Sequence, residues 1–359
     1  MKSLWMNITE KSEGNVIDFS VNTNPFGISE RVRESLAEIV DILEFYPDSD
    51  CGRLRGMLAD KYNISKDSIL CGNGADDLLY RLIFAERPRK AVVIEPTFEE
   101  YSRALRIAGC EVIHYQMSRE RMFDLDDGVL EVLNQDIDMV FLCNPNNPTG
   151  CLTAPPLLKC ILEKCVQNDS LLVVDECFME FIPDWKGRTV KQKAADSRKL
   201  VVIDAFTKTY ALAGFRLGYC ISGNQELLAS MKGWGQGFGV SVPAQFAGIC
   251  SLEDKEYMEK TYIFLEEERA WLSERLVKLG MELVPSKTNY LLLRSPGVDI
   301  REQLEQKRMK VRDCSQFYGL GREYCRIAIR MHEENKQLVL ALEEIEKVNR
   351  KKRFASKYN

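Results

Sequence analysis

One stretch decides the fold: Asp204-Ala-Phe-Thr-Lys-Thr-Tyr-Ala-Leu-Ala-Gly-Phe-Arg-Leu-Gly-Tyr219, which directly follows the apolar run Leu200-Val-Val-Ile203. Similar apolar runs stand upstream at Ala91–Ile94, Met139–Leu142 and Leu171–Val174. Near-continuous apolarity over about four residues is typical of a strand that is buried on both faces. Because helical patterns separate the runs, the sequence predicts an α/β fold in which helices cover a mostly parallel sheet.

Short polar motifs follow these strand-like runs. They are Gly72-Asn-Gly-Ala-Asp76, Asn144-Pro-Asn-Asn-Pro-Thr-Gly150, Asp175-Glu176 and the stretch around Lys208. The intervals from Asn147 to Asp175 and from Asp175 to Lys208 are 28 and 33 residues, about the length of one βαβ unit. Open α/β sheets bind ligands at the carboxyl ends of their strands, so we expect the motifs to converge on one site.

The residue types in these motifs match the needs of one cofactor. Lys208 supplies an amine that can form a Schiff base, and Asp175 supplies a carboxylate for a pyridine nitrogen. Asn147 supplies an amide for a phenolic oxygen, and the loop at 72–76 supplies backbone N–H groups for a phosphate. This set predicts a site for pyridoxal phosphate (PLP).

The order and spacing of the motifs resemble the aspartate aminotransferase superfamily, the class I/II aminotransferases of PLP fold type I, over nearly the whole chain. The resemblance implies a large PLP-binding domain, residues 46–250, with a mostly parallel sheet of the seven-stranded type. It also implies a smaller α+β domain from residues 1–45 and 251–359. An amphipathic pattern from about Asp254 to Leu279 predicts the long helix that leaves the large domain.

The resemblance assigns a role to each motif residue. Lys208 would be the catalytic residue. The cofactor-binding residues would be Gly74, Ala75, Asp76, Phe98, Asn147, Asp175, Thr207, Lys208, Arg216 and Tyr46. Tyr46 matches a family tyrosine that reaches the phosphate of the neighbouring subunit, which implies a homodimer. From the residues alone, Lys208 could instead be a surface lysine, Asn147 a turn former and Phe98 ordinary core.

The substrate residues expected from the resemblance are Asn24, Arg312, Arg326 and Arg330. Arg326 matches the position that binds the substrate carboxylate. Three guanidiniums exceed the need of one carboxylate, so we expect a small amino acid with a second anion, a phosphate or a phosphonate. The alternative for Arg312 and Arg330 is a surface ion pair with Asp or Glu.

Two branches of the superfamily fit best, and the threonine-phosphate decarboxylases of cobalamin synthesis come first. Their pattern is similar to Asp18-Phe-Ser-Val-Asn-Thr-Asn-Pro25, Phe98-Glu-Glu-Tyr-Ser-Arg103, Asn289-Tyr-Leu-Leu-Leu-Arg294 and the segment Val311–Arg330. Phe178 stands where aminotransferases commonly have tyrosine. The usual His-Gly-Gly of the decarboxylases is absent from Met1–Asn15, and Ala205 replaces a common Ser or Thr.

The leading expectation is therefore decarboxylation of O-phospho-L-threonine. The alternatives are transamination of histidinol phosphate or a phosphono-amino acid, and an inactive binding protein with the PLP fold. Retention of Lys208 together with Asp175, Asn147 and Arg216 disfavours an inactive protein.

Composition excludes other classes. A net charge of −5 and a pI near 5.5 argue against nucleic-acid binding. Twelve cysteines without a Cys-x-x-Cys pair predict free thiols and a cytoplasmic location, and two histidines make a metal site improbable. No apolar run reaches the roughly 18 residues of a membrane span, and Met1–Met6 does not begin a signal peptide.

Overall fold

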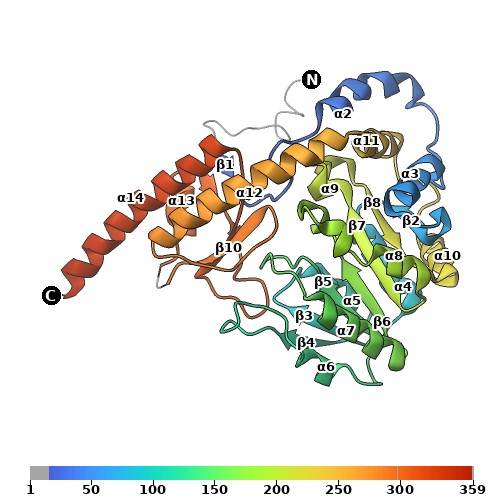
Figure 1. The fold of residues 1–359 in the computed structure, drawn as a ribbon, viewed down its shortest axis with the longest axis horizontal. Helices are drawn as coiled ribbons and strands as arrows, with labels where there is room; N and C mark the ends of the chain where they lie inside the picture. Colours follow the sequence, from blue (N-terminus) through green and yellow to red (C-terminus); the bar gives the residue numbers. More distant parts are fainter. Residues whose placement is uncertain (1–15, 297, 358–359) are drawn as a thin grey trace.

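The computed structural model describes residues 16–296 and 298–357 (Figure 1). Its main feature is a seven-stranded sheet with the order β2-β8-β7-β6-β5-β3-β4. The strands are β2 Ile69–Gly72, β3 Lys90–Glu95, β4 Glu111–Gln116, β5 Met139–Cys143, β6 Leu171–Asp175, β7 Leu200–Ala205 and β8 Gly218–Ile221. Only the pairs that β8 makes, with β2 and β7, are antiparallel. The prediction of a mostly parallel sheet is confirmed.

Each face of this sheet carries its own apolar core. Val201 and Ile203 of β7 pack in one core, while Val202 packs in the other, because successive side chains of a strand point to opposite faces. One core is covered by α4 Ala75–Glu86, α5 Glu100–Ile107 and α10 Gln225–Gly233; the other is covered by α3 Gly52–Tyr62, α7 Pro155–Gln167, α8 Lys191–Asp196 and α11 Val242–Glu253. Burial on both faces accounts for the uninterrupted apolar runs in the sequence.

A second sheet lies at the other end of the molecule. Its antiparallel order is β12-β13-β10-β9, and a separate parallel pair joins β1 to β11. The bounds are β1 Ile17–Asp18, β9 Glu282–Leu283, β10 Tyr290–Arg294, β11 Met309–Lys310, β12 Arg312–Asp313 and β13 Tyr324–Ala328. The long helix α12, Lys255–Lys278, extends from the large sheet to this one, as predicted (Figure 1).

The helices of the second unit are α13 Arg301–Gln306 and α14 His332–Lys357, which packs on α12. The remaining helical segments are α2 Glu30–Ser35, η1 Leu36–Ile42, η2 Lys66–Ser68, α6 Val129–Val132, η3 Met179–Phe181, η4 Trp185–Gly187, α9 Phe206–Thr209 and η5 Ala213–Phe215.

The domain limits at residues 46 and 250 stay a prediction, and the expectations for Met1–Asn15 lie outside the described residues. Within the described ranges, none of the helices has the length and apolar character to cross a membrane.

Candidate active site

A cavity of about 500 Å³ lies where strands of the large sheet end. Most of the residues predicted for the site line it: Ala75, Asp76, Phe98, Asn147, Asp175, Thr207, Lys208, Arg216, Arg312 and Arg326. They come from segments far apart in the sequence, since β13 of the second sheet adds Arg326 to motifs that follow strands of the first. The convergence expected from the sequence is therefore present in the structure.

Lys208 lies in the short helix α9, directly after β7. Its Nζ donates a hydrogen bond to Oδ1 of Asn22 at 3.1 Å and lies 5.9 Å from the ring centroid of Phe178. Among the described residues, no carboxylate forms an ion pair with this amine. Burial and, to a smaller extent, the positive charge of Arg326 together lower the pKa of Lys208 to about 8. At pH 7 about a tenth of this amine is therefore unprotonated and nucleophilic, far more than for a lysine with the ordinary pKa.

Asp175 ends β6 and faces the same cavity. Its Oδ2 accepts a hydrogen bond from the Tyr101 hydroxyl, and its Oδ1 accepts one from the backbone N–H of Cys177 at 2.9 Å. The Tyr101 ring stacks on Phe141 at 5.3 Å, which fixes the hydroxyl. Tyr101 was not predicted, although it lies in the Phe98–Arg103 motif, because a tyrosine in a helix is usually core.

The start of α4 forms a place for an anion. Gly74 has a φ of +87°, and a Cβ there would lie 2.7 Å from Nη2 of Arg216. Because Gly74 has no Cβ, the Arg216 guanidinium can lie against the start of α4. The first N–H groups of this helix, at Ala75 and Asp76, have no partner within the helix. Arg216 also lies 3.5 Å from Oδ2 of Asp76. These donors fit a phosphate.

Two arginines face each other at the opposite wall. Arg312 of β12 pairs in register with Arg326 of β13. Nη1 of Arg326 donates to Oδ1 of Asn147 at 2.6 Å and Nη2 to the carbonyl of Ser20 at 2.8 Å, while the buried Nε has no partner within residues 16–296 and 298–357. Burial lowers the pKa of Arg326. Like charges directly across a strand pair destabilise each other, so an anion between them would relieve the repulsion.

Asn24, predicted to bind substrate, does not line the cavity. Its Nδ2 donates to the carbonyl of Thr209 at 3.0 Å and to Oγ1 of Thr261 at 2.9 Å. Asn24 therefore stabilises the segment that carries Lys208 without facing the cavity. Asn22, two residues earlier, lines the cavity instead, and its buried Nδ2 has no partner in the described part of the chain. The motif at Asp18–Pro25 was predicted correctly as part of the site, but the sequence does not show which of its two asparagines, Asn22 or Asn24, faces the cavity.

Arg330 also lies outside the cavity. The predicted strand 326–330 begins and ends two residues earlier, so Arg330 does not share a strand face with Arg326. Its guanidinium donates to Oε1 of Glu334 at 2.9 Å, in the first turn of α14. Arg312 agrees with both alternatives predicted for it: it lines the cavity, as a substrate-binding residue would, and it also forms an ion pair with Glu99 at 3.3 Å.

Tyr46 is far more exposed than the other predicted site residues. It is 82% exposed and stacks on Phe238 with ring centroids 4.7 Å apart. It does not line the cavity of its own chain.

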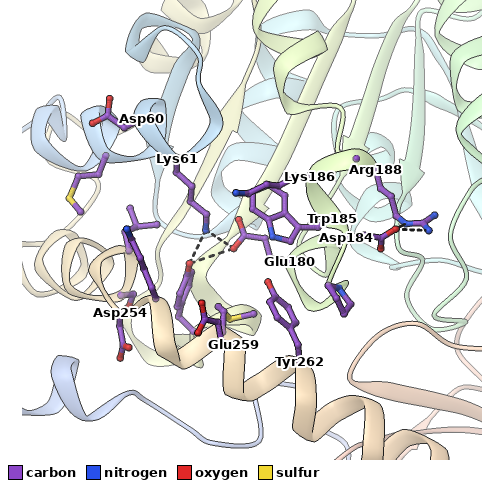
Figure 2. A pocket seen from close by; sticks show the side chains of 18 of the residues that line it. Asp60, Lys61, Glu180, Asp184, Trp185, Lys186, Arg188, Asp254, Glu259 and Tyr262 are labelled. Atoms are coloured by element: carbon purple, nitrogen blue, oxygen red, sulfur yellow. Dashed lines mark hydrogen bonds and ion pairs between the residues drawn. The ribbon is translucent and has the colours of Figure 1, made fainter.

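A larger cavity of about 1130 Å³ lies elsewhere (Figure 2). At its floor, Nζ of Lys61 lies 2.6 Å from Glu180 and 2.8 Å from the Tyr210 hydroxyl, so these groups satisfy one another. None of the predicted site residues lines it. The smaller cavity combines the Lys208 amine, the Asp175 carboxylate and the phosphate-binding groups at the start of α4. These groups fit pyridoxal phosphate. Within the described residues, no cluster of His, Cys, Asp and Glu could hold a metal ion.

Comparison with known proteins agrees with this geometry. The family model described as aminotransferase class I and II matches residues 14–342. Threonine-phosphate decarboxylase of Salmonella typhimurium is 35% identical over 337 residues, covering 93% of this chain and 92% of the relative. Histidinol-phosphate aminotransferase of Symbiobacterium thermophilum is 32% identical over 331 residues, covering 91% and 90%.

The fold is also similar to a solved structure. The histidinol-phosphate aminotransferase from Clostridium acetobutylicum superposes with a TM-score of 0.87 at 27% identity, covering 92% of this chain and 99% of that one. The chain therefore spans nearly the full length of the proteins that it resembles.

Proposed function

We propose that this chain, which belongs to the class I and II aminotransferase family and is a pyridoxal phosphate-dependent enzyme, decarboxylates O-phospho-L-threonine. The substrate class is a small amino acid with a second anionic group. The 35% identity to a threonine-phosphate decarboxylase supports this reaction, and the alternative of an inactive binding protein is set aside because both relatives named above are enzymes.

The facing pair of Arg312 and Arg326 is the observation that carries the proposal. Two guanidiniums line one small cavity, and Nε of Arg326 is buried without a partner. Asn22, with its buried unpaired amide, adds a further donor beside Lys208. A carboxylate and a phosphate on one substrate would supply acceptors for all three residues.

Each residue would have a defined task. Bound pyridoxal phosphate supplies an electron sink for a bond at the substrate Cα. Asp175 would hold the proton on the pyridine nitrogen, and Asn147, whose carbonyl accepts from Arg326, would donate its amide N–H to the phenolic oxygen. Lys208, with its pKa lowered to about 8, would return a proton to Cα after carbon dioxide leaves.

Phe178 further supports a reaction other than ordinary transamination. It is buried, and its ring packs edge-on against Tyr290 at 5.0 Å. A phenylalanine cannot donate to the phenolic oxygen of the cofactor, as a tyrosine hydroxyl would. Asn147 is then the principal candidate donor for that oxygen among the cavity residues.

Transamination of histidinol phosphate or a phosphono-amino acid is the second candidate. The similarity to two histidinol-phosphate aminotransferases, one by sequence and one by structure, favours it. Such a substrate would also bring a phosphate to the arginines, so the charge argument does not separate the two reactions.

A substrate panel separates them. Holoenzyme is incubated with O-phosphothreonine, O-phosphoserine, histidinol phosphate and phosphonoalanine, with and without 2-oxoglutarate, while carbon dioxide and glutamate are measured. Carbon dioxide without a need for the oxo acid supports the decarboxylase, whereas glutamate formation supports the aminotransferase. Equal activity on unphosphorylated threonine would contradict the anion pocket.

We also propose that the active enzyme is a cytoplasmic homodimer. The exposed Tyr46 is available to reach a neighbouring cavity, and all twelve cysteines are free thiols, which suits a reducing compartment. Mixing Tyr46→Phe subunits with Lys208→Ala subunits tests the shared site. If hybrid dimers behave as though each site came from one chain, the proposal fails.

A further inference from the structure

A group of buried charges lies next to the candidate site but takes no part in the proposed chemistry. Its centre is Lys191 at the start of α8, which has no solvent exposure. Nζ of Lys191 lies 2.9 Å from Oε2 of Glu176 and 2.8 Å from Oδ2 of Asp204. Glu176 follows Asp175 in the chain, and Asp204 precedes Lys208 by four residues. The ammonium therefore joins the two segments that carry the proposed catalytic groups.

Hydrogen bonds connect this centre to the larger cavity. Oδ2 of Asp204 lies 2.8 Å from the Tyr219 hydroxyl, and the hydroxyls of Tyr219 and Tyr62 are within hydrogen-bond distance of each other, so the single Tyr219 proton goes either to Asp204 or to Tyr62. Tyr62 donates to Glu180, which pairs with Lys61 at the floor of the larger cavity (Figure 2). Three carboxylates thus share two ammonium groups. Burial raises the pKa of Asp204 to about 6, against the lowering effect of Lys191, so a proton can neutralise the surplus negative charge.

The position of Lys191 relative to the sheet matters. The pairing of β6 with β7 ends at Asp175 and Ile203, and one more bond joins the N–H of Glu176 to the carbonyl of Ile203 at 2.9 Å. Beyond that point the ion pairs of Lys191 hold the two strand ends together. Glu176 directly follows Asp175, the last residue of β6, so a displacement of the backbone at Glu176 also displaces Asp175.

We propose that Lys191 is a positioning residue, whose ammonium fixes the carboxyl ends of β6 and β7 and thereby sets the distance from Asp175 to Lys208. This inference rests on the roles given to Asp175 and Lys208 in the proposed function. Without Lys191, the carboxylates of Glu176 and Asp204 would face each other in a buried space, and the strand ends would separate or one carboxylate would take up a proton.

The test uses holoenzyme with Lys191→Met, which keeps most of the stem and removes the charge. We expect the pH midpoint of the visible absorbance of the bound cofactor to shift by about half a pH unit or more. We expect kcat to fall about tenfold to a hundredfold while KM changes little, because catalysis is sensitive to misplacement of a catalytic group by about 1 Å. In cofactor-free protein, the pH at which Lys208 reacts with an amine reagent should shift as well.

Two further variants separate positioning from stability. Ile161→Ala, in the fully buried part of α7, should lower the melting temperature by leaving a cavity but should not move either pH midpoint. The double variant Lys191→Met/Asp204→Asn removes one of the two unpaired carboxylates, so it should recover melting temperature while the absorbance midpoint stays shifted. An unchanged midpoint in both Lys191 variants, or the same shift in Ile161→Ala, would overturn the positioning role.

The absorbance and amine readouts need only the cofactor and Lys208. If the wild-type enzyme proves inactive on O-phosphothreonine, the proposed substrate fails, yet the midpoints still decide the role of Lys191. If the enzyme is active and the midpoints do not move, the positioning role alone fails.

Discussion

Two lysines of this molecule, the buried Lys191 and the half-buried Lys208, differ in their partners. Lys191 has carboxylates within 2.9 Å on two sides, and these carboxylates raise its pKa although burial alone would lower it. Among the residues that the structure describes, Lys208 has only the neutral amide oxygen of Asn22 within hydrogen-bond distance, and burial together with Arg326 lowers its pKa to about 8. Both lysines lie beside the ends of the same two strands.

This difference distinguishes a lysine that stabilises the structure from a lysine that is available for catalysis. A buried ammonium with two carboxylates is held charged and in place, so it serves structure. A half-buried amine without a carboxylate partner is available for chemistry, and in the same cavity Nε of Arg326 and Nδ2 of Asn22 have no hydrogen-bond partner among the described residues. In this cavity the unsatisfied groups stand together with an amine that lacks a carboxylate partner among the described residues, and this combination marks the place where a ligand belongs.

The variant with the largest expected effect removes Lys208, the lysine that has no carboxylate partner among the described residues. Lys208→Ala should lower kcat by at least about a thousandfold, because both the nucleophile and the proton carrier at Cα are lost. Steady-state carbon dioxide release measures the effect, and the visible absorbance shows whether cofactor remains bound. Residual turnover above about a tenth of the wild-type rate would place the reactive amine elsewhere.

Arg326, whose Nε has no hydrogen-bond partner among the described residues, should have the next largest effect. Arg326→Ala should lower kcat/KM for the anionic substrate by about ten- to a hundredfold, since a charge-assisted bond is worth about 1.5–3 kcal/mol. Arg312→Ala, whose side chain already pairs with Glu99, is the matched comparison and should lose less. If Arg312→Ala loses more than Arg326→Ala, the unpaired nitrogen is a poor guide to the anion site.

Sequence reasoning reached the fold and most of the cavity because both depend on local patterns. Uniform apolar runs placed β3, β5, β6 and β7, and the motifs after the strands placed Lys208, Asp175 and Asn147. The antiparallel strand β8 was not foreseen, since four buried residues do not reveal direction. The choice of Asn24 over Asn22, and of Arg330 as a strand residue, depended on side-chain direction and strand limits that only tertiary contacts fix.

The pH dependence of the amine sharpens the comparison. In cofactor-free protein the Lys208 amine should become reactive as the pH rises through about 8, because its pKa lies below the ordinary 10.5 and the unprotonated form is the reactive one. Peptide mapping after brief treatment with an amine reagent at a series of pH values measures this. Reactivity that begins only near pH 10, as for a surface lysine, would contradict the effect of burial.

The smallest expected change concerns Phe178, whose ring lies near Lys208. Phe178→Tyr adds a hydroxyl that could donate to the phenolic oxygen, and we expect kcat for decarboxylation to change by only about two- to tenfold. The ratio of carbon dioxide to glutamate formed is the useful measurement. A shift of that ratio towards glutamate would support the link between Phe178 and the reaction type, whereas an unchanged ratio would remove Phe178 as an argument.

Borohydride reduction of holoenzyme, followed by peptide mapping, tests the central claim most directly. The account predicts that the pyridoxyl mass appears on the peptide that contains Lys208 and that Lys191 and Lys61, which have carboxylate partners, stay unlabelled. A label on Lys191 or Lys61, or no label on any lysine, would contradict the claim that the unpaired lysine is the reactive one.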